Sequence, residues 1–198
     1  MIGVARTMWA YGDWNVADFA FNLVSFEPDR PKNGTLWDAL LAFRDRLVEK
    51  CDPGDGAPEG NRFFWRSDFM VHRASNRYLS IRMSSTRTVR SEACNQEGLQ
   101  NYHLGDGVTL FTQRGDEYDG IFPAWDWKRV PGVTCLRSDE PLPVLSVGKD
   151  QGADLFVGGA SDGENGVAGM RSVRDGVSAR KAWFCHDSIV VCLGADIA

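Results

Sequence analysis

Short apolar runs separated by turn-forming residues dominate the chain from Asn61 to its end. Glycine, proline, asparagine or aspartate interrupts these runs every few residues, which favours β-strands joined by turns. The pattern predicts a mostly β protein in which residues 61–198 form an antiparallel β-sandwich. The expected strands are Arg62–Trp65, Met70–Arg73, Tyr78–Val89, Val108–Thr112, Leu142–Val147, Phe156–Gly158, Gly166–Val173, Ser178–Cys185 and Ser188–Leu193.

The expected strands also indicate which side chains face the core and where the chain turns. After Tyr78, every second residue is apolar: Leu79, Ile81 and Met83. Arg82 should therefore point away from the core, because neighbouring residues of a strand face opposite sides of its sheet. Hairpin turns are expected at Gly115–Tyr118 and at Arg174–Val177, where Gly and Asp residues cluster.

The first sixty residues follow a different pattern. Residues 35–50 predict a helix, because Thr35 can cap its N-terminus and apolar residues then recur at helical spacing. The turn-rich segment 51–60 separates this helix from the sandwich. Two parts are therefore expected: an N-terminal segment over residues 1–60, serving as a linker or as a cover for an exposed sheet face, and a sandwich domain over residues 61–198.

The distribution of charge narrows the classes of partner. The net charge is −5, so the chain lacks the basic surplus typical of proteins that bind nucleic acids or anionic membranes. Between Asn61 and Arg90, however, seven arginines stand against one acid, Asp68. This local excess is compatible with a site for an anionic ligand, and equally with solvated charges along strand edges.

Neither a metal nor another cofactor is indicated. The five cysteines are widely spaced and form no CxxC pair, and the histidines show no metal-ligand spacing. His72 and His103 are instead expected to be structural. No apolar run reaches the length of about 18 residues that a membrane-spanning helix needs, and the N-terminal residues lack the features of a secretory signal.

Several short motifs occur in a fixed order, including Glu-x-x-Asn-x-Glu, Gly-Asp-Gly and Pro-Gly. The segments that contain them are Phe64–Arg73, Ser80–Glu97, Gly105–Phe111, Phe122–Thr134, Asn165–Met170 and Lys181–Phe184. In this order they resemble polysaccharide lyase family 8, which includes chondroitin and hyaluronate lyases. The Asp-Glu-Tyr and Trp-Asp-Trp variants most resemble the chondroitinase ABC branch. Gly98 and Val133 stand where the family has asparagine and threonine.

The resemblance implies that the chain contains the central β-sandwich of such an enzyme, of the super-sandwich type. A helical toroid domain precedes this sandwich in the family and carries the catalytic tyrosine, its histidine or asparagine partner, and an arginine. By motif, Glu92 corresponds to the cleft glutamate that orients those groups, and Asn95 to a substrate-contacting asparagine. The isolated chain is therefore expected to be inactive. An acidic polysaccharide such as chondroitin sulfate or hyaluronan is the expected partner, and the family implies a secreted or periplasmic protein.

Purely structural roles for the same residues are also compatible with the sequence. Glu92 could be a surface acid paired with Arg87 or Arg90, and Asn95 could simply form a turn. Trp125 and Trp127 could be core anchors instead of surfaces on which sugar rings stack. Further substrate contacts are expected from Arg87, Arg90, Tyr102, Trp125 and Trp127.

Three functions fit these observations. The first is a portion of a polysaccharide lyase that cleaves uronic-acid polysaccharides by β-elimination, incomplete without the toroid domain. The alternative is a non-catalytic binding module for acidic polysaccharides, in which the arginine-rich stretch from Arg62 to Arg90 holds the ligand. A third possibility is a truncated gene product whose fold persists without a ligand.

Overall fold

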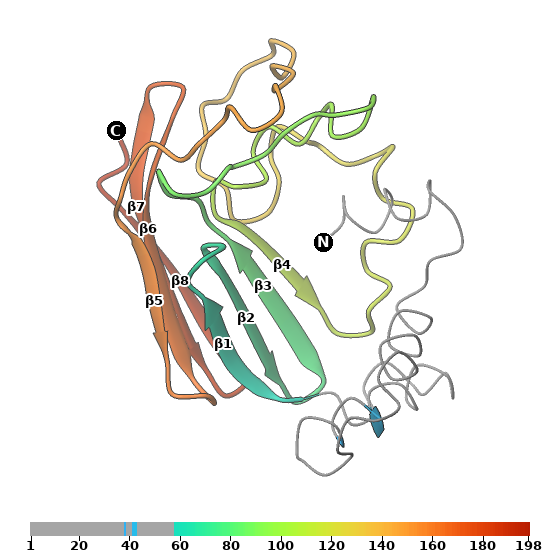
Figure 1. Ribbon diagram of the computed structural model, residues 1–198, viewed down its shortest axis with the longest axis vertical. Helices are drawn as coiled ribbons and strands as arrows, with labels where there is room; N and C mark the ends of the chain where they lie inside the picture. Colours follow the sequence, from blue (N-terminus) through green and yellow to red (C-terminus); the bar gives the residue numbers. More distant parts are fainter. Residues whose placement is uncertain (1–37, 39–40, 43–57) are drawn as a thin grey trace, which may run out of the picture. The chain divides into compact units, whose positions relative to one another are not determined.

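The computed structural model describes residues 38, 41, 42 and 58–198 (Figure 1). Residues 58–198 form one compact unit. The helix expected over residues 35–50 lies outside the described residues, apart from positions 38, 41 and 42. Among the described residues, no helix combines the length and the apolar character needed to cross a bilayer.

Residues 58–198 fold into two four-stranded antiparallel sheets (Figure 1). The strands of the first sheet are β1 (Gly60–Phe64), β2 (Phe69–Ala74), β3 (Arg77–Arg82) and β4 (Val108–Thr112). Those of the second are β5 (Val157–Ser161), β6 (Gly166–Arg174), β7 (Val177–His186) and β8 (Ile189–Ala195). In each sheet the strands are adjacent in the same order as in the sequence. The predicted antiparallel β-sandwich is confirmed.

Apolar side chains from both sheets fill the space between them. The core residues are Met70, Leu79, Ile81, Met83, Val157, Ala168, Met170, Trp183 and Cys185. The alternation predicted for β3 and the residue after it is confirmed, because its three apolar residues are at most 6% exposed. The Trp183 indole also donates a hydrogen bond to Thr109 Oγ1 at 3.0 Å. This polar contact joins β4 to β7, and the apolar core joins β2 and β3 to β5, β6 and β7.

The strand β3 ends at Arg82, whereas the sequence predicts a strand as far as Val89. The chain leaves the sheet because the hydroxyls of Ser85 and Thr88 turn back onto a buried carboxylate. They donate hydrogen bonds to Asp68 at 2.6 and 2.7 Å. Side-chain hydrogen bonds of this kind compete with the backbone hydrogen bonds between strands. Here they take the place of a longer β3.

The connection between β4 and β5 contains two further differences from the prediction. Leu142–Val147 forms no strand in the described part of the chain, since Pro141 and Pro143 lack the N–H groups that a ladder requires. Gly115–Tyr118 is an irregular loop, not the predicted hairpin turn. The Glu117 carboxylate organises it by accepting hydrogen bonds at 2.7–2.9 Å from the backbone amides of Gln113, Arg114 and Gly115.

The second predicted hairpin turn, Arg174–Val177, is present. Arg174 and Val177 pair at the ends of β6 and β7, so that only Asp175 and Gly176 form the loop. Their φ angles are 51° and 83°. A two-residue hairpin loop with both φ angles positive is favoured by the Asp-Gly sequence, because aspartate tolerates this conformation and glycine adopts it without strain.

Candidate functional site

The connection between β3 and β4, residues 83–107, lies at one end of the sandwich. The β6–β7 hairpin lies at the same end, which we call the loop end, whereas the β2–β3 and β7–β8 turns lie at the opposite end (Figure 1). Arg90 Nη2 donates to the Val173 carbonyl at 2.8 Å. The long connection is thereby attached to the second sheet.

Glu92 and Asn95 are both exposed on this connection. Glu92 Oε2 accepts a hydrogen bond from the Gly148 amide at 3.0 Å, and the Glu92 carbonyl accepts one from the Asn101 side chain at 2.9 Å. Asn95 lies in a turn with φ 52°, a conformation that asparagine adopts more readily than most residues. Both side chains therefore lie outside the apolar core, on a non-helical segment.

Arg87 is half-exposed and contacts a buried carboxylate. Its Nη2 donates to Asp68 Oδ1 at 2.6 Å, and the two side chains are 52% and 0% exposed. Burial by itself raises the pKa of Asp68, but hydrogen bonds from Ser85, Thr88 and Arg87 together lower it below its ordinary value. Arg87 thus stabilises a charged carboxylate while part of its guanidinium remains accessible to solvent.

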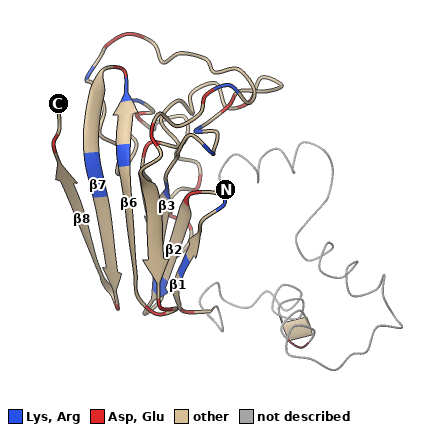
Figure 2. Cartoon of the chain, turned by 60° about the vertical axis from the view of Figure 1, so that its left-hand side comes forward, with Lys and Arg blue, Asp and Glu red and all other residues tan. Residues whose placement is uncertain are grey.

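Arg90 and Tyr102 are buried in a polar cluster that joins the two sheets. This loop-end network consists of Arg90, Tyr102, His103, Asp106, Asp150 and Arg174. Arg90 Nη1 and Arg174 Nε each lie 3.7 Å from the Asp106 carboxylate. Figure 2 shows that the basic residues of β6 and β7 lie in the half of the sheet nearer this end. Both candidates have protein partners in the network, and substrate contact through them stays a prediction.

The Tyr102 hydroxyl is engaged within the protein. It donates to Asp175 Oδ1 at 2.7 Å, and the Arg174 guanidinium lies 3.5 Å from the centre of the Tyr102 ring. Burial, followed by the hydrogen bond to Asp175, raises the pKa of Tyr102 to about 12. A phenol with this pKa is poorly suited to accept a proton as a base near neutral pH.

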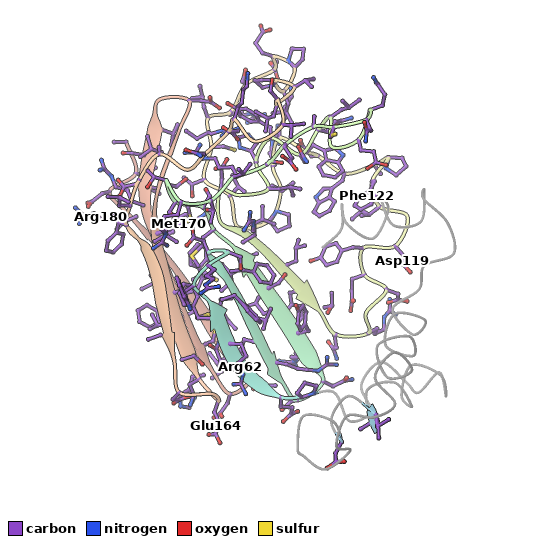
Figure 3. The ribbon with its side chains drawn as sticks, in the orientation of Figure 1. Arg62, Asp119, Phe122, Glu164, Met170 and Arg180 are labelled. Carbon is purple, nitrogen blue, oxygen red and sulfur yellow. The ribbon has the colours of Figure 1, made fainter. Side chains whose placement is uncertain are left out.

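Trp125 and Trp127 belong to an aromatic cluster in the connection between β4 and β5. Trp125 stacks with Tyr118 and Phe122, at centroid distances of 5.6 and 6.2 Å, and lies 5.3 Å from Trp127. Trp127 Nε1 donates to the Phe122 carbonyl at 3.2 Å. Figure 3 shows Phe122 in this connection, away from the core residue Met170. Both tryptophans are partly exposed, so the cluster offers aromatic surface on which a sugar ring can stack.

Lys181 of β7 fixes the Pro-Gly segment that follows the aromatic cluster. Its Nζ donates to the Gly132 carbonyl and lies 5.5 Å from the centre of the Trp183 ring. The adjacent Pro131 carbonyl accepts a hydrogen bond from Thr109 at 2.9 Å. Lys181 is only 8% exposed, and burial lowers its pKa to about 8, against the opposing effect of the Asp106 charge.

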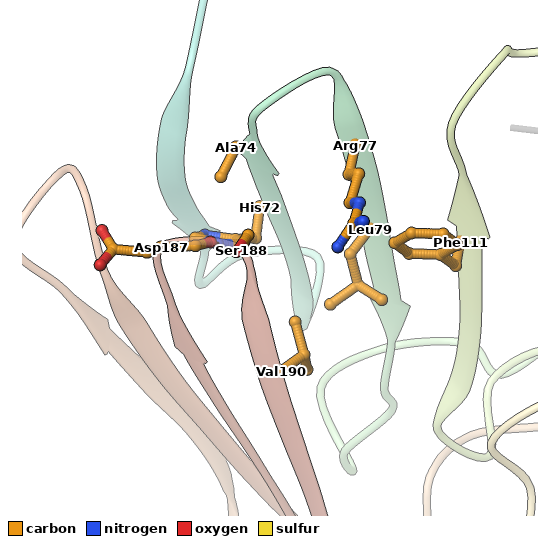
Figure 4. Close-up of a pocket in the computed structure, with 8 residues that line it drawn as sticks. All are labelled: His72, Ala74, Arg77, Leu79, Phe111, Asp187, Ser188 and Val190. Carbon is orange, nitrogen blue, oxygen red and sulfur yellow. Dashed lines mark hydrogen bonds between the residues drawn. The ribbon is translucent and has the colours of Figure 1, made fainter.

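The opposite end of the sandwich has a small hollow that contains none of the expected site residues. Figure 4 shows it lined by side chains that include His72, Leu79 and Phe111, beside the β7–β8 turn. His72 Nε2 donates to the Asp187 carbonyl at 2.7 Å, and its Nδ1 lies 3.5 Å from the Asn61 amide. These contacts are those of a structural histidine. Across the described ranges, no group of three or more His, Cys, Asp and Glu side chains is arranged to hold a metal ion.

Two buried charges that organise the site, Arg174 and Lys181, were not singled out by the sequence. A signal for both was nevertheless present. Arg174 continues the alternation that places Met170 in the core, and Lys181 shares its face of β7 with Trp183. A charged residue in the buried phase of a strand requires polar partners inside the protein. The partner Asp150 lies in an irregular segment and had no such signal.

The fold and the loop end belong to a known class of carbohydrate-degrading protein. The chain is a member of polysaccharide lyase family 8, and residues 59–198 match the super-sandwich domain of that family. It is 40% identical over 134 residues to Chondroitinase-AC of Pedobacter heparinus, covering 68% of this chain and 19% of that protein. It is 36% identical over 166 residues to Hyaluronate lyase of Thermasporomyces composti, covering 81% and 21%.

A solved chondroitinase AC lyase, studied in complexes with oligosaccharides, has the same fold. It superimposes with a TM-score of 0.77 at 33% sequence identity, covering 92% of this chain and 27% of that chain. The predicted family and the predicted super-sandwich fold are both confirmed.

The comparisons correct one expectation. The motif variants predict a stronger resemblance to the chondroitinase ABC branch, but identity to the chondroitin sulfate ABC exolyase of Bacteroides thetaiotaomicron is 29% over 175 residues, covering 77% of this chain and 17% of that protein. This value is below the 40% found with Chondroitinase-AC, so the prediction was wrong. The chain spans about a fifth of the length of Chondroitinase-AC and of Hyaluronate lyase.

Proposed function

We propose that residues 58–198 form one wall of the substrate cleft of a polysaccharide lyase that acts on uronic-acid polysaccharides by β-elimination. One observation carries the proposal: Glu92 is exposed at the loop end, with its carboxylate oriented by the Gly148 amide. A carboxylate accepts several hydrogen bonds, and this contact uses one of them. The remaining acceptor positions suit a sugar hydroxyl or a catalytic group brought by another domain.

β-Elimination sets clear requirements for such a cleft. A base removes the proton from the carbon that bears the uronate carboxylate. The electron pair of that C–H bond forms a double bond to the adjacent carbon, and the glycosidic oxygen leaves with a proton from an acid. The uronate carboxylate must be neutralised as the enolate develops. In our proposal Glu92 orients the catalytic groups, and Asn95 contacts the sugar.

The base, in this proposal, lies outside residues 58–198. Tyr102 is buried, bonded to Asp175, and its pKa is raised to about 12. Burial also raises the pKa of Tyr78, against the lowering effect of the Arg73 charge. The Tyr118 hydroxyl is bonded to the backbone of Phe111. These environments favour a catalytic tyrosine on the helical toroid that the resemblance implies, with the present chain supplying only its side of the cleft.

A pair of asparagine variants tests the substrate-facing role. Asn95 and Asn76 are both exposed and have φ angles of 52° and 63°, but Asn76 lies in the β2–β3 turn at the opposite end of the sandwich. Glycine keeps both turns without strain. Asn95→Gly should weaken binding of a chondroitin tetrasaccharide roughly threefold to tenfold, as expected for one lost hydrogen bond. Asn76→Gly should leave it unchanged, and equal effects of the two variants would contradict the proposal.

An elimination assay tests whether the isolated chain can cleave a polysaccharide without another domain. Incubating the isolated chain with chondroitin sulfate or hyaluronan should give no rise in ultraviolet absorbance from unsaturated uronide. Robust turnover would show that the base lies within this chain, with Tyr78 and Tyr102 the first candidates for substitution. The binding-module alternative receives less support, because Arg62, Arg82, Arg87 and Arg90 all bond to groups of the protein.

A further inference from the structure

A single buried arginine holds together the segments that surround Glu92. Arg174, the last residue of β6, is 6% exposed. Its Nη1 donates to both carboxylate oxygens of Asp150 at 2.8 Å, and its Nη2 donates to the Tyr102 carbonyl at 3.0 Å. One side chain thus bridges β6, the 83–107 connection and the segment at Asp150.

The segment at Asp150 also supplies the amide that orients Glu92. Gly148 donates to Glu92 Oε2 at 3.0 Å from a backbone with φ 67°. The Arg90 amide donates to the Asp150 carbonyl at 2.7 Å. The backbone at Arg90, which shortly precedes Glu92, is therefore bonded to Asp150, which shortly follows Gly148. The position of the Gly148 amide relative to the Glu92 carboxylate depends on where Asp150 is held.

We infer that Arg174 is a positioning residue for Glu92, acting through Asp150 and Gly148. Arg174 Nη1 contacts both oxygens of Asp150 while Nη2 of the same rigid, planar guanidinium bonds to the Tyr102 carbonyl, so these bonds together fix the orientation of the group. The arrangement is a poor source of stability, because the buried Nε atoms of Arg90 and Arg174 have no hydrogen-bond partner within the described part of the chain. Buried ion pairs are also often no more stable than apolar residues of the same volume. Fixed geometry is the better account of this network.

The amide proton of Gly148 gives a direct test in the 198-residue chain. A hydrogen bond to a carboxylate moves an amide resonance downfield, so Glu92→Gln should shift the Gly148 signal in the NMR spectrum. If Arg174 positions this contact, the shift caused by Glu92→Gln is lost in the Arg174→Lys and Asp150→Asn backgrounds. Lysine keeps the charge but lacks the second nitrogen that holds the Tyr102 carbonyl and the planar group that lies over the Tyr102 ring.

The same strand offers a matched control. Arg171 also lies on β6 and pairs with Asp154 at 3.1 Å, but its side chain is 52% exposed. Arg171→Lys should leave the effect of Glu92→Gln on the Gly148 signal unchanged. The indole N–H signal of Trp183 reports whether the core of each variant is intact.

The inference is overturned if Glu92→Gln shifts the Gly148 signal equally in wild type and in a folded variant of the Arg174–Asp150 pair. The Asp150 side chain is 20% exposed, so Asp150→Asn keeps the test available if Arg174→Lys unfolds. The expected effect of Arg174 on substrate binding rests on the proposed function and is tested separately. Shifts of the Gly148 signal on adding a chondroitin tetrasaccharide should be lost in Arg174→Lys and retained in Arg171→Lys. If the effect of Glu92→Gln on the Gly148 signal depends on Arg174 but the tetrasaccharide causes no shift even in wild type, the positioning role stands and the proposed function fails.

Discussion

Replacing Lys181 by methionine should make the free energy of unfolding depend on pH in a characteristic way. Lys181 is 8% exposed in β7, where its Nζ contacts the Gly132 carbonyl. Burial lowers its pKa from 10.5 to about 8, with the Asp106 charge opposing the effect. The folded state therefore bears the cost of a buried ammonium group at neutral pH. Methionine fills a similar volume without that charge.

The magnitude follows from the difference in pKa between the two states. Between pH 8 and pH 10.5 the unfolded chain holds a proton on this lysine that the folded chain has released. The free energy of unfolding then rises with pH, because the unfolded state binds more protons. Each unit of pKa difference is worth about 1.4 kcal/mol, so the wild type should gain about 3 kcal/mol relative to Lys181→Met across this range. The gain is lost progressively as the pH falls from 10.5 to 8.

Urea unfolding followed by tryptophan fluorescence, with a reducing agent present, measures this difference. Burial raises the pKa of Cys185 to about 11 and, with the Asp175 hydrogen bond, that of Tyr102 to about 12. Both groups favour unfolding as the pH rises, but they are present in both proteins and cancel in the difference. Arg180→Met on the same strand, 70% exposed, is the control, because arginine does not titrate in this range. A pH-independent difference for Lys181→Met would refute the argument.

Two further predictions concern packing and buried charge. Asp68→Asn should lower the free energy of unfolding by about 1–3 kcal/mol at neutral pH, because it weakens the buried bonds from Ser85 and Thr88. Since folding lowers the pKa of Asp68 below 3.8, the difference from wild type, measured by urea titrations, should shrink as the pH falls through the folded value. Gly166→Ala should destabilise by about 1–3 kcal/mol, because its Cβ would lie 2.0 Å from the Asn61 side chain. Gly158→Ala meets nothing within 4 Å and should raise the melting temperature slightly, and a destabilised Gly158→Ala protein would contradict this account.

The extent to which the sequence predicted the fold depended on whether the interactions were local. Alternation along β3 placed Ile81 in the core correctly, and the Asp-Gly pair predicted the β6–β7 hairpin. Both features are decided by neighbouring residues. The end of β3 was missed because it depends on Asp68, which captures two hydroxyls that follow the strand. The strand expected over 142–147 is absent from the described residues, because Pro141 and Pro143 lack the N–H groups that a sheet requires, although the segment is apolar.

The candidate site divides in the same way. By its motifs the sequence determined the family, the antiparallel sandwich, and the loop on which Glu92 and Asn95 are exposed. Tertiary structure alone decided that Arg90 and Tyr102 are buried, because Arg90 bonds to the Val173 carbonyl and Tyr102 bonds to Arg174, and both partners lie more than seventy residues away along the chain. Burial and hydrogen bonding depend on which segments pack together in space. The alternation of residues along one strand does not identify those distant segments.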